Sequence, residues 1–195
     1  MKTNDMKKTA FFLLTCLCLI AIGGRSLAQD ADAMKKLTDF MTPGDMQKIL
    51  AAANGKWSEE ITLWMAPGQP PSKSTGTVDY KMILGGRYQQ GNITASFNGM
   101  PYEAESITGY DNMKKLFFSS YVDNMGTGIL NMEGTYDTGT KTITLTGTEL
   151  DPMTGKEMKM QETLKMIDDH TEVTAMYDVT SGKEIKLMEI TLKHM

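Results

Sequence analysis

From Trp57 to the end of the chain, hydrophobic and polar residues alternate within short segments instead of recurring at the three- and four-residue spacing of a helix. Val78 and Tyr80, for example, fall on one face of an extended segment, and Asp79 and Lys81 fall on the other. A period of two residues is typical of a β-strand with one buried face. The pattern predicts strands over Trp57–Met65, Thr75–Leu84, Arg87–Phe97, Tyr102–Tyr110, Lys115–Val122, Gly128–Tyr136, Thr142–Leu150, Glu157–Ile167, Glu172–Val179 and Glu184–His194.

Short turns join these predicted strands. Pairs such as Gly85-Gly86, Asn98-Gly99 and Ser181-Gly182 supply the positive φ angles or the side-chain acceptors that a β-hairpin needs. Consecutive strands should therefore be antiparallel neighbours, and we predict an all-β fold, an up-and-down antiparallel barrel of about ten strands. Because a barrel of about eight strands is just wide enough for side chains to fill, about ten strands predict an internal cavity.

A helical segment, residues 29–54, precedes the predicted barrel domain, residues 55–195. Its apolar residues recur at three- and four-residue spacing, as at Met34, Leu37 and Met41. One or two short α-helices are expected, with Thr42 as the N-cap of the second. We expect this segment to pack across one mouth of the barrel; a partner-binding segment or a mobile lid is the alternative.

Residues 1–28 have the organisation of a secretory signal peptide. Lys2 and Lys7 lie before an apolar run over Ala10–Ile22, and Ser26-Leu27-Ala28 is a small-x-small cleavage site. Cleavage near Ala28 predicts a periplasmic or secreted protein. The apolar run is shorter than the roughly 20 residues of a membrane span, and no later stretch replaces it, so no membrane span is predicted.

The cysteine content and the net charge limit which bonds and which binding partners the mature protein can have. Cys16 and Cys18 both lie inside the apolar run, so cleavage would leave no disulfide, free thiol or thiolate ligand. The formal charge of −4 would become about −7 after cleavage, since the signal carries more basic than acidic residues. An acidic chain without a basic cluster is a poor binder of phosphate backbones, and we expect no nucleic-acid partner.

No catalytic constellation is recognisable. His170 and His194 are the two histidines, and neither accompanies a nucleophile elbow, paired metal ligands or a phosphate-binding glycine loop. We therefore predict no catalytic residues, no metal site and no cofactor, while enzymatic activity stays open. Met158 and Met160 share one face of a strand, where two thioethers could bind copper(I); filling an irregular core or lining an apolar pocket is the stronger interpretation.

The densest cluster of polar residues and glycines, residues 123–128, joins the fifth predicted strand to the sixth. It is longer than a tight turn requires, and loops at a barrel mouth are where binding residues concentrate; a structural Asx-type loop is the alternative. Nearby tyrosines and an arginine would complete a polar mouth. The candidate ligand-binding residues are Arg87, Tyr88, Tyr102, Tyr110, Tyr121, Asp123, Asn124 and Met125.

Glu162 completes this candidate set because it lies among apolar residues of the eighth predicted strand. Met160 and Leu164 share its face. A carboxylate on an apolar face costs several kcal/mol unless it is paired. We expect Glu162 at the rim of the barrel with Arg87 as its partner; the alternative is an anchor inside the cavity, where a raised pKa would suit a hydrolase or isomerase.

Several motifs carry a resemblance to a known family. Gly55-Lys56-Trp57 resembles the opening signature of lipocalin-type barrels and marks Gly55 and Trp57 as structural residues. With residues 84–88, 109–112, 123–128, 151–156 and 188–190, the chain resembles the bacterial domain-of-unknown-function family 1579 from about Gly44 to the C-terminus. That resemblance implies a lipocalin-like, calycin-type barrel, in a family without a settled activity.

The same shape is similar to fatty-acid-binding proteins and to the ten-stranded nitrobindin haem barrels. A haem barrel needs an inward histidine on a late strand, and only His194 could serve. We predict a secreted barrel that binds a small, mostly apolar ligand without catalysis. The alternatives are a filled barrel that binds an envelope protein, for instance through the N-terminal helices, and a haem- or copper-binding barrel.

Overall fold

The computed structural model describes residues 30–65 and 68–195; the predicted signal peptide, residues 1–28, lies outside them. The chain divides into two units, residues 1–42 and 43–195. In the first unit, residues 30–41 form a helix whose apolar side chains are exposed, among them Leu37 and Phe40. None of the helices in the described residues is long and apolar enough to cross a membrane.

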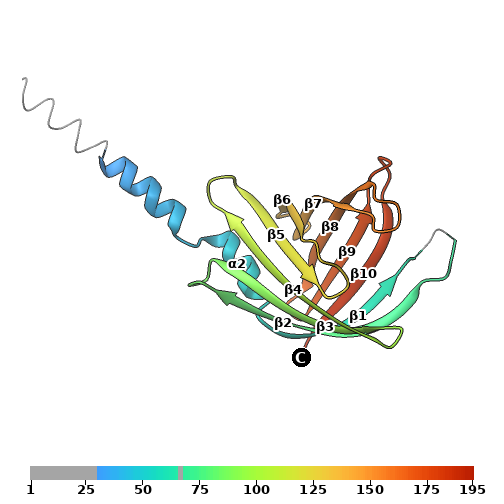
Figure 1. The fold of residues 1–195 in the computed structure, drawn as a ribbon. Helices are drawn as coiled ribbons and strands as arrows, with labels where there is room; N and C mark the ends of the chain where they lie inside the picture. The colour runs from blue at the N-terminus through green and yellow to red at the C-terminus, as the bar shows by residue number, and fades with distance from the viewer. Residues whose placement is uncertain (1–29, 66–67) are drawn as a thin grey trace, which may run out of the picture. The chain divides into compact units, whose positions relative to one another are not determined.

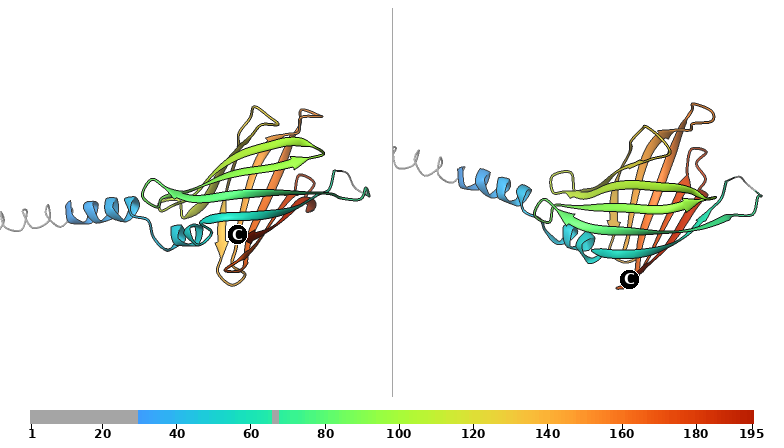
Figure 2. Two further views of the ribbon diagram at one scale, coloured as in Figure 1. Left: turned by 90° about the horizontal axis from the view of Figure 1, so that it is seen from below. Right: turned by 60° about the horizontal axis from the view of Figure 1, so that its bottom comes forward.

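The second unit is a closed barrel in which every strand pairs antiparallel with the next along the chain (Figures 1 and 2). The last strand pairs with the first, from Trp57 opposite His194 to Leu63 opposite Met188, and so closes the barrel. This confirms the predicted up-and-down antiparallel barrel. The strands are β1 (Gly55–Leu63), β2 (Ser72–Ile83), β3 (Tyr88–Phe97), β4 (Met100–Asp111), β5 (Leu116–Asp123), β6 (Leu130–Asp137), β7 (Thr142–Leu150), β8 (Glu157–Asp168), β9 (Thr171–Asp178) and β10 (Ile185–His194).

A short helix, α2 (Asp45–Ala52), lies at one end of the barrel, next to β2, β3 and β4 (Figure 1). The predicted N-cap, Thr42, is wrong: its hydroxyl donates to the Thr38 carbonyl and so belongs to the preceding helix. Gly44 is the N-cap, and its N–H donates to the Gln47 side chain, 2.8 Å away. The Gln47 side chain thus supplies an acceptor for a backbone N–H at the start of the helix.

Side-chain hydrogen bonds fix α2 to the barrel. The Gln47 amide donates to the Tyr110 carbonyl at 3.0 Å, and the Gln89 amide donates to the Leu50 carbonyl at 2.7 Å. Both amides are buried, so these bonds satisfy groups that would otherwise be costly to bury. The helix is therefore a fixed cap on one mouth, as the packing interpretation predicted, and we call this the capped end.

The core lies against this cap. One cluster contains Leu50 of α2 and the fully buried Phe117 and Leu145, and a second surrounds Trp57. The first is tightly packed because Gly134 lies opposite both Phe117 and Leu145 on its neighbouring strands. A Cβ atom at Gly134 would lie 1.8 Å from the Thr144 carbonyl oxygen. Glycine is thus the residue that lets these strands approach so closely.

Candidate ligand-binding interior

The strand register shows which side chains face the inside of the barrel, because residues directly opposite one another share a face. Trp57 is fully buried, so its face is the inner one. Following the paired residues from strand to strand then identifies the inward residues of all ten strands. The acids on it are Glu59, Asp123, Glu149, Glu162, Glu172 and Asp178, and no inward position on these strands holds lysine or arginine.

Glu59 follows Trp57 on this inner face of β1. Its side chain is 4% exposed, and its Oε2 atom is buried without a hydrogen-bond partner among the described residues. A Cβ atom on Gly76, the residue opposite on β2, would lie 2.6 Å from that oxygen. Glycine thus makes room for the carboxyl group. Burial raises the pKa of Glu59 to about 7 because the charged form is poorly solvated there.

Two further carboxyl groups share the interior. Glu172 is buried on β9, and its Oε1 atom accepts a 3.4 Å hydrogen bond from the Thr174 hydroxyl. Burial raises its pKa to about 7, and the charge of Glu162 adds to that shift. Glu162 lies on the inner face of β8 opposite the fully buried Leu145, and burial raises its pKa to about 7 as well.

The position of Glu162 corrects a prediction. It lies inside the barrel, not at the rim, because β8 is paired on both sides around it. A guanidinium partner would lower the pKa of a carboxyl group, whereas burial raises that of Glu162. Arg87 lies in the turn between β2 and β3, where its Nη1 atom donates to the Leu84 carbonyl at 3.1 Å. The expected pairing of Glu162 with Arg87 is therefore wrong.

Tyr80 of β2 also faces the inside of the barrel. Burial raises its pKa well above 10, and the charges of Glu172, Glu59 and Glu162 add to that shift in this order. The strand register places all three glutamates on the inner face together with Tyr80, and Tyr80 and Glu172 line the same small pocket below α2. The Tyr80 ring packs over Gly91, where a Cβ atom would lie 2.9 Å from Cε1 of Tyr80 and 2.6 Å from the Ser106 hydroxyl oxygen.

The interior is nearly filled under α2, whereas several inward side chains farther along the barrel keep accessible surface. A pocket of about 20 Å³ lies directly below the helix, between Tyr80, Gln89 and Glu172, with room for about one water molecule. Farther along, Glu162 is surrounded by protein, yet it keeps part of its surface accessible. Of the other half-buried inward side chains, Leu164 and Met166 also line the small pocket below α2, whereas Met158, Met176, Met188 and Ile190 do not.

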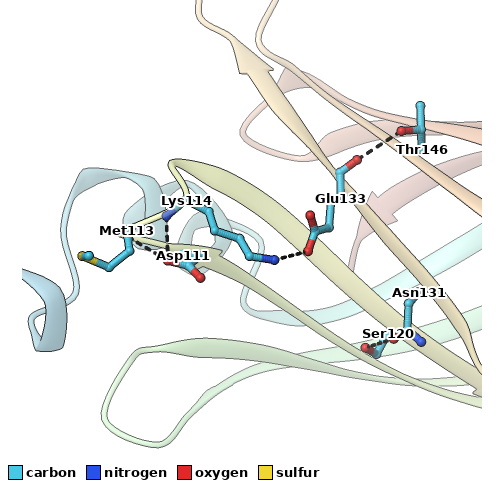
Figure 3. Close-up of polar contacts among 7 residues, drawn as sticks. All are labelled: Asp111, Met113, Lys114, Ser120, Asn131, Glu133 and Thr146. Carbon is cyan, nitrogen blue, oxygen red and sulfur yellow. Dashed lines mark hydrogen bonds and ion pairs between the residues drawn. The ribbon is translucent and has the colours of Figure 1, made fainter.

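A larger pocket, of about 370 Å³, lies elsewhere, along the outer face of β5 and β6, and Figure 3 shows polar side chains of this region. Its polar walls satisfy one another: Lys114 pairs with Glu133 at 2.6 Å, and the Ser120 hydroxyl donates to the Asn131 side chain at 2.6 Å. No side chain in this described wall is a buried, unpaired group. We therefore place the candidate site in the interior, where Glu59 is such a group.

Three of the predicted ligand-binding residues, Tyr102, Tyr121 and Asp123, come together at the end of the barrel opposite α2, which we call the open end. The hydroxyl groups of Tyr102 and Tyr121 lie 2.5 Å apart, and Tyr102 also donates to the Asp123 carboxylate at 3.2 Å. Burial raises the pKa of Tyr121 to about 12, and the charges of Asp123, Glu59 and Glu162 contribute to the shift. The inward polar side chains therefore extend as far as the open end of the barrel.

Asp123 and Asn124 also hold the loop itself. The Oδ1 atom of Asp123 accepts the N–H groups of Met125 and Gly126, which is an Asx turn. Asn124 accepts the N–H of Glu103 and donates to the Pro101 carbonyl. The structural role that was the alternative for this loop is thus present, and Met125 is half exposed outside the network.

Three other predicted residues lie away from this mouth. Tyr102 and Tyr110 stand at opposite ends of β4, and Tyr110 packs on Phe117 near α2 with ring centroids 4.9 Å apart. Tyr88 is on the outer face, against Phe118. Arg87 is exposed at the capped end. The prediction that Arg87, Tyr88, Tyr102 and Tyr110 form one mouth is therefore wrong.

Comparison with known proteins identifies the family. Residues 42–194 match the family described as "Protein of unknown function (DUF1579)". The chain belongs to this family. The solved structure titled "Crystal Structure of Rv2717c from M. tuberculosis" is similar, with a TM-score of 0.59 and 14% identity over 79% of this chain and 99% of that one. At that identity the likeness concerns the fold alone. No curated protein matches the chain.

In this DUF1579 barrel the Gly55-x-Trp57 motif builds the capped end. The Trp57 indole donates to the Ala53 carbonyl at 2.8 Å, and the His194 ring packs edge-on against the indole. Gly55 has φ +118°, and a Cβ atom there would lie 2.7 Å from Nε2 of His194. The same Nε2 lies 3.3 Å from the Asn54 carbonyl oxygen. His194 therefore takes part in closing this end.

The sequence prediction missed Glu59, Glu172 and Tyr80. A usable signal was present for Glu59, because it alternates with the apolar residues Trp57 and Ile61 and so falls on the same face of the first strand. Glu172 was taken as the first residue of a strand, and a terminal carboxylate ordinarily points to solvent. Its burial follows from pairing with Leu192 on one side and Met166 on the other, which sequence spacing does not show.

Proposed function

We propose that this DUF1579 barrel binds a small, mostly apolar ligand in its interior and does so without catalysis. The observation that carries the proposal is the half-open inner face of β8, where Met158, Leu164 and Met166 keep accessible surface inside a closed barrel. Ligand sites are concave and mainly apolar, with a few convergent polar groups. Tyr80 and Glu162 supply such groups in this interior.

We also propose that the protein acts in the periplasm or outside the cell. The support is the sequence of residues 1–28, with its basic start, apolar run and small-x-small site at Ala28. Intact mass of the protein from its own host tests this directly. The expected mass is that of a chain beginning near Gln29, and a mass including residues 1–28 would contradict the proposal.

Acid–base catalysis is the second candidate, favoured by one observation. A carboxyl group with a pKa of about 7, as at Glu162, can both take up and release a proton near neutral pH. An isomerase or hydrolase would then turn over its substrate with a rate that Glu162→Gln abolishes. Binding without turnover, in the parent protein, would support the non-catalytic function.

Native mass spectrometry of the protein from its own host tests interior binding, together with a fluorescent probe, N-phenyl-1-naphthylamine. We expect a released small molecule and an increase of probe fluorescence. Ser106→Phe places a ring beside Tyr80 and should abolish the increase. Ser96→Phe is the matched control, since Ser96 is exposed. Equal fluorescence in both variants, or none in the parent, would overturn interior binding.

A further inference from the structure

We propose that the interior ligand is an organic amine, whose ammonium group lies among Glu59, Glu162 and Glu172 while its apolar body lies against the methionines of β8. This inference rests on the proposed function and names the chemical class of its ligand.

The charges on the inner face all have one sign. Acids occupy inward positions on β1, β5, β7, β8 and β9, and the inward positions of the ten strands contain no lysine or arginine to neutralise them. Buried carboxylates require a paired charge or a full set of hydrogen bonds. Lys141, which is exposed in the turn between β6 and β7, lines the small pocket below α2. The strands themselves supply no positive charge to the inward acids, so a cationic ligand would complete the interior.

Glu59 provides the second and independent observation. Its side chain is more than nine-tenths buried, faces the interior between Trp57 and Ile61, and leaves Oε2 without a hydrogen-bond partner among the described residues. A buried acceptor that lacks a hydrogen bond destabilises the folded protein. A donor that arrives with the ligand would satisfy it, and an ammonium group carries only donors.

Tyr80 suits the same head group. Its side chain shares the inner face with the three glutamates and lines one pocket together with Glu172. An aromatic face attracts an ammonium group, and the hydroxyl can accept one of its hydrogen bonds. Beyond the head group, Met158, Leu164 and Met166 offer an adaptable apolar wall for the rest of the molecule.

The spacing of the acids favours an organic cation over a metal ion. Glu59, Glu162 and Glu172 come from three strands, β1, β8 and β9. In the described part of the chain, no group of three or more histidine, cysteine, aspartate or glutamate side chains lies close enough together to hold a metal ion. An ammonium group needs no such compact set, because it can donate to one or two of these acids and be attracted by the charge of the others.

Affinity for an amine should rise with pH. The three glutamates are partly protonated near neutral pH, and each binds an ammonium group well only when ionised. On α2, Lys48 pairs with Asp45 in solvent. The other titratable groups that face the interior are Tyr80 on β2, Tyr102 and Tyr110 on β4, Tyr121 and Asp123 on β5, Tyr136 on β6, Lys141 in the turn between β6 and β7, Glu149 on β7, Asp178 on β9 and His194 on β10.

Decylamine, decanol and decanoate have the same length of apolar chain and differ in their polar group, so they test which polar group the interior binds. Each is titrated calorimetrically into the intact protein below its micelle concentration. At about pH 8 we expect decylamine to bind at least about tenfold more tightly than either of the others, since charge pairing in a buried site exceeds this. The decylamine affinity should fall by about tenfold or more between pH 8 and pH 6, while that of decanol stays constant.

Variants locate the ammonium group. Glu59→Gln and Glu162→Gln should each weaken decylamine at least about tenfold and leave decanol unchanged. Glu60→Gln is the matched control, because Glu60 is the next residue on β1 but faces solvent, where it pairs with Lys193. An unchanged decylamine affinity in both interior variants would overturn the inference, as would a loss in Glu60→Gln of the same size.

The outcomes separate the inference from the proposed function. Decanol or decanoate binding as tightly as decylamine, with Ser106→Phe blocking it, would overturn the amine and support interior binding. Failure of all three probes to bind the parent protein would overturn both. Calcium binding that competes with decylamine and is lost in Glu162→Gln would assign the acids to a metal ion and overturn the inference.

Discussion

Trp57 and Glu59 are successive inward residues of β1, and they belong to two different kinds of interior. Trp57, at the capped end, is 1% exposed, donates its indole N–H to the Ala53 carbonyl and packs with Val78 and Leu192. Glu59 is equally buried, but its Oε2 atom has no hydrogen-bond partner among the described residues.

The difference shows that the packing at the capped end stabilises the fold, whereas the buried carboxyl groups in the middle of the barrel destabilise it. The capped end has matched donors and acceptors and closely packed apolar side chains. The middle keeps carboxyl groups in a place where burial disfavours their charged forms, which costs stability. Uncompensated polar groups of this kind are expected at functional sites. The following substitutions would sharpen or break this contrast.

Trp57→Ala should have the largest effect, a loss of about 3 to 5 kcal/mol, because it leaves a cavity in the second core cluster and an unpaired Ala53 carbonyl. Thermal unfolding measures it. A fall in Tm of less than about 2 °C would show that the indole does not hold the capped end together.

Gly134→Ala should cost about 2 to 3 kcal/mol. Its new methyl group would lie 1.8 Å from the Thr144 carbonyl oxygen, so the backbone of β7 has to move. Gly128→Ala is the matched control, since nothing lies within 4 Å of a Cβ atom there. Urea unfolding of the two variants should separate them, and equal midpoints would refute the close approach of β6 and β7.

Glu162→Gln should make stability less dependent on pH. Burial raises the pKa of Glu162 from 4.5 to about 7, so the folded protein keeps a proton that the unfolded chain releases in this range. The resulting stability is fully present below about pH 4.5 and is lost as the pH rises through about 7. Glutamine cannot ionise, so the variant should exceed the parent by about 1 to 2 kcal/mol at pH 8 and equal it at pH 4.

The measurement is denaturant unfolding across this pH range, with Glu60→Gln as the solvent-facing control. The expected gain is smaller than the full pKa shift implies because Glu162 keeps accessible surface that water can solvate. Parallel pH dependence in the parent and Glu162→Gln would contradict a buried, easily protonated carboxyl group.

Asp123→Ala should cost about 1 kcal/mol, the smallest of these effects, because three donors lose their acceptor at a partly exposed loop. Asp169→Ala, in the exposed turn between β8 and β9, serves as the control. We also expect proteolysis within residues 123–129 to become faster in Asp123→Ala. Unchanged stability and proteolysis would show that the Asx turn does not hold this loop.

The strand pattern was sufficient to predict the barrel, because turns such as Asn98-Gly99 force neighbouring strands to pair and the alternation sets one buried face. The helix cap was misplaced by two residues, since Thr42 bonds backwards to Thr38 instead of forwards to α2. Both Thr42 and Gly44 precede a plausible helix start, and sequence alone does not choose between them.

The candidate site could be predicted only in part. Tyr102, Tyr121 and Asp123 were placed together because they lie near one loop, and the structure joins them by hydrogen bonds. Arg87 and Tyr88 were grouped with them, but a barrel has two ends and an outer face. Which end or face a residue occupies depends on counting register through every strand, and a bulge such as that between Met166 and Asp168 changes the count.

The most direct test of an acidic, ligand-accessible interior is carbon NMR of glutamate side chains labelled with ¹³C, titrated with pH in the free protein and with decylamine. We predict that Glu59, Glu162 and Glu172 titrate near pH 7, well above the other glutamates, and that decylamine lowers all three pKa values. If every glutamate instead titrates at about 4 to 5 and decylamine shifts none, the account of the interior is contradicted.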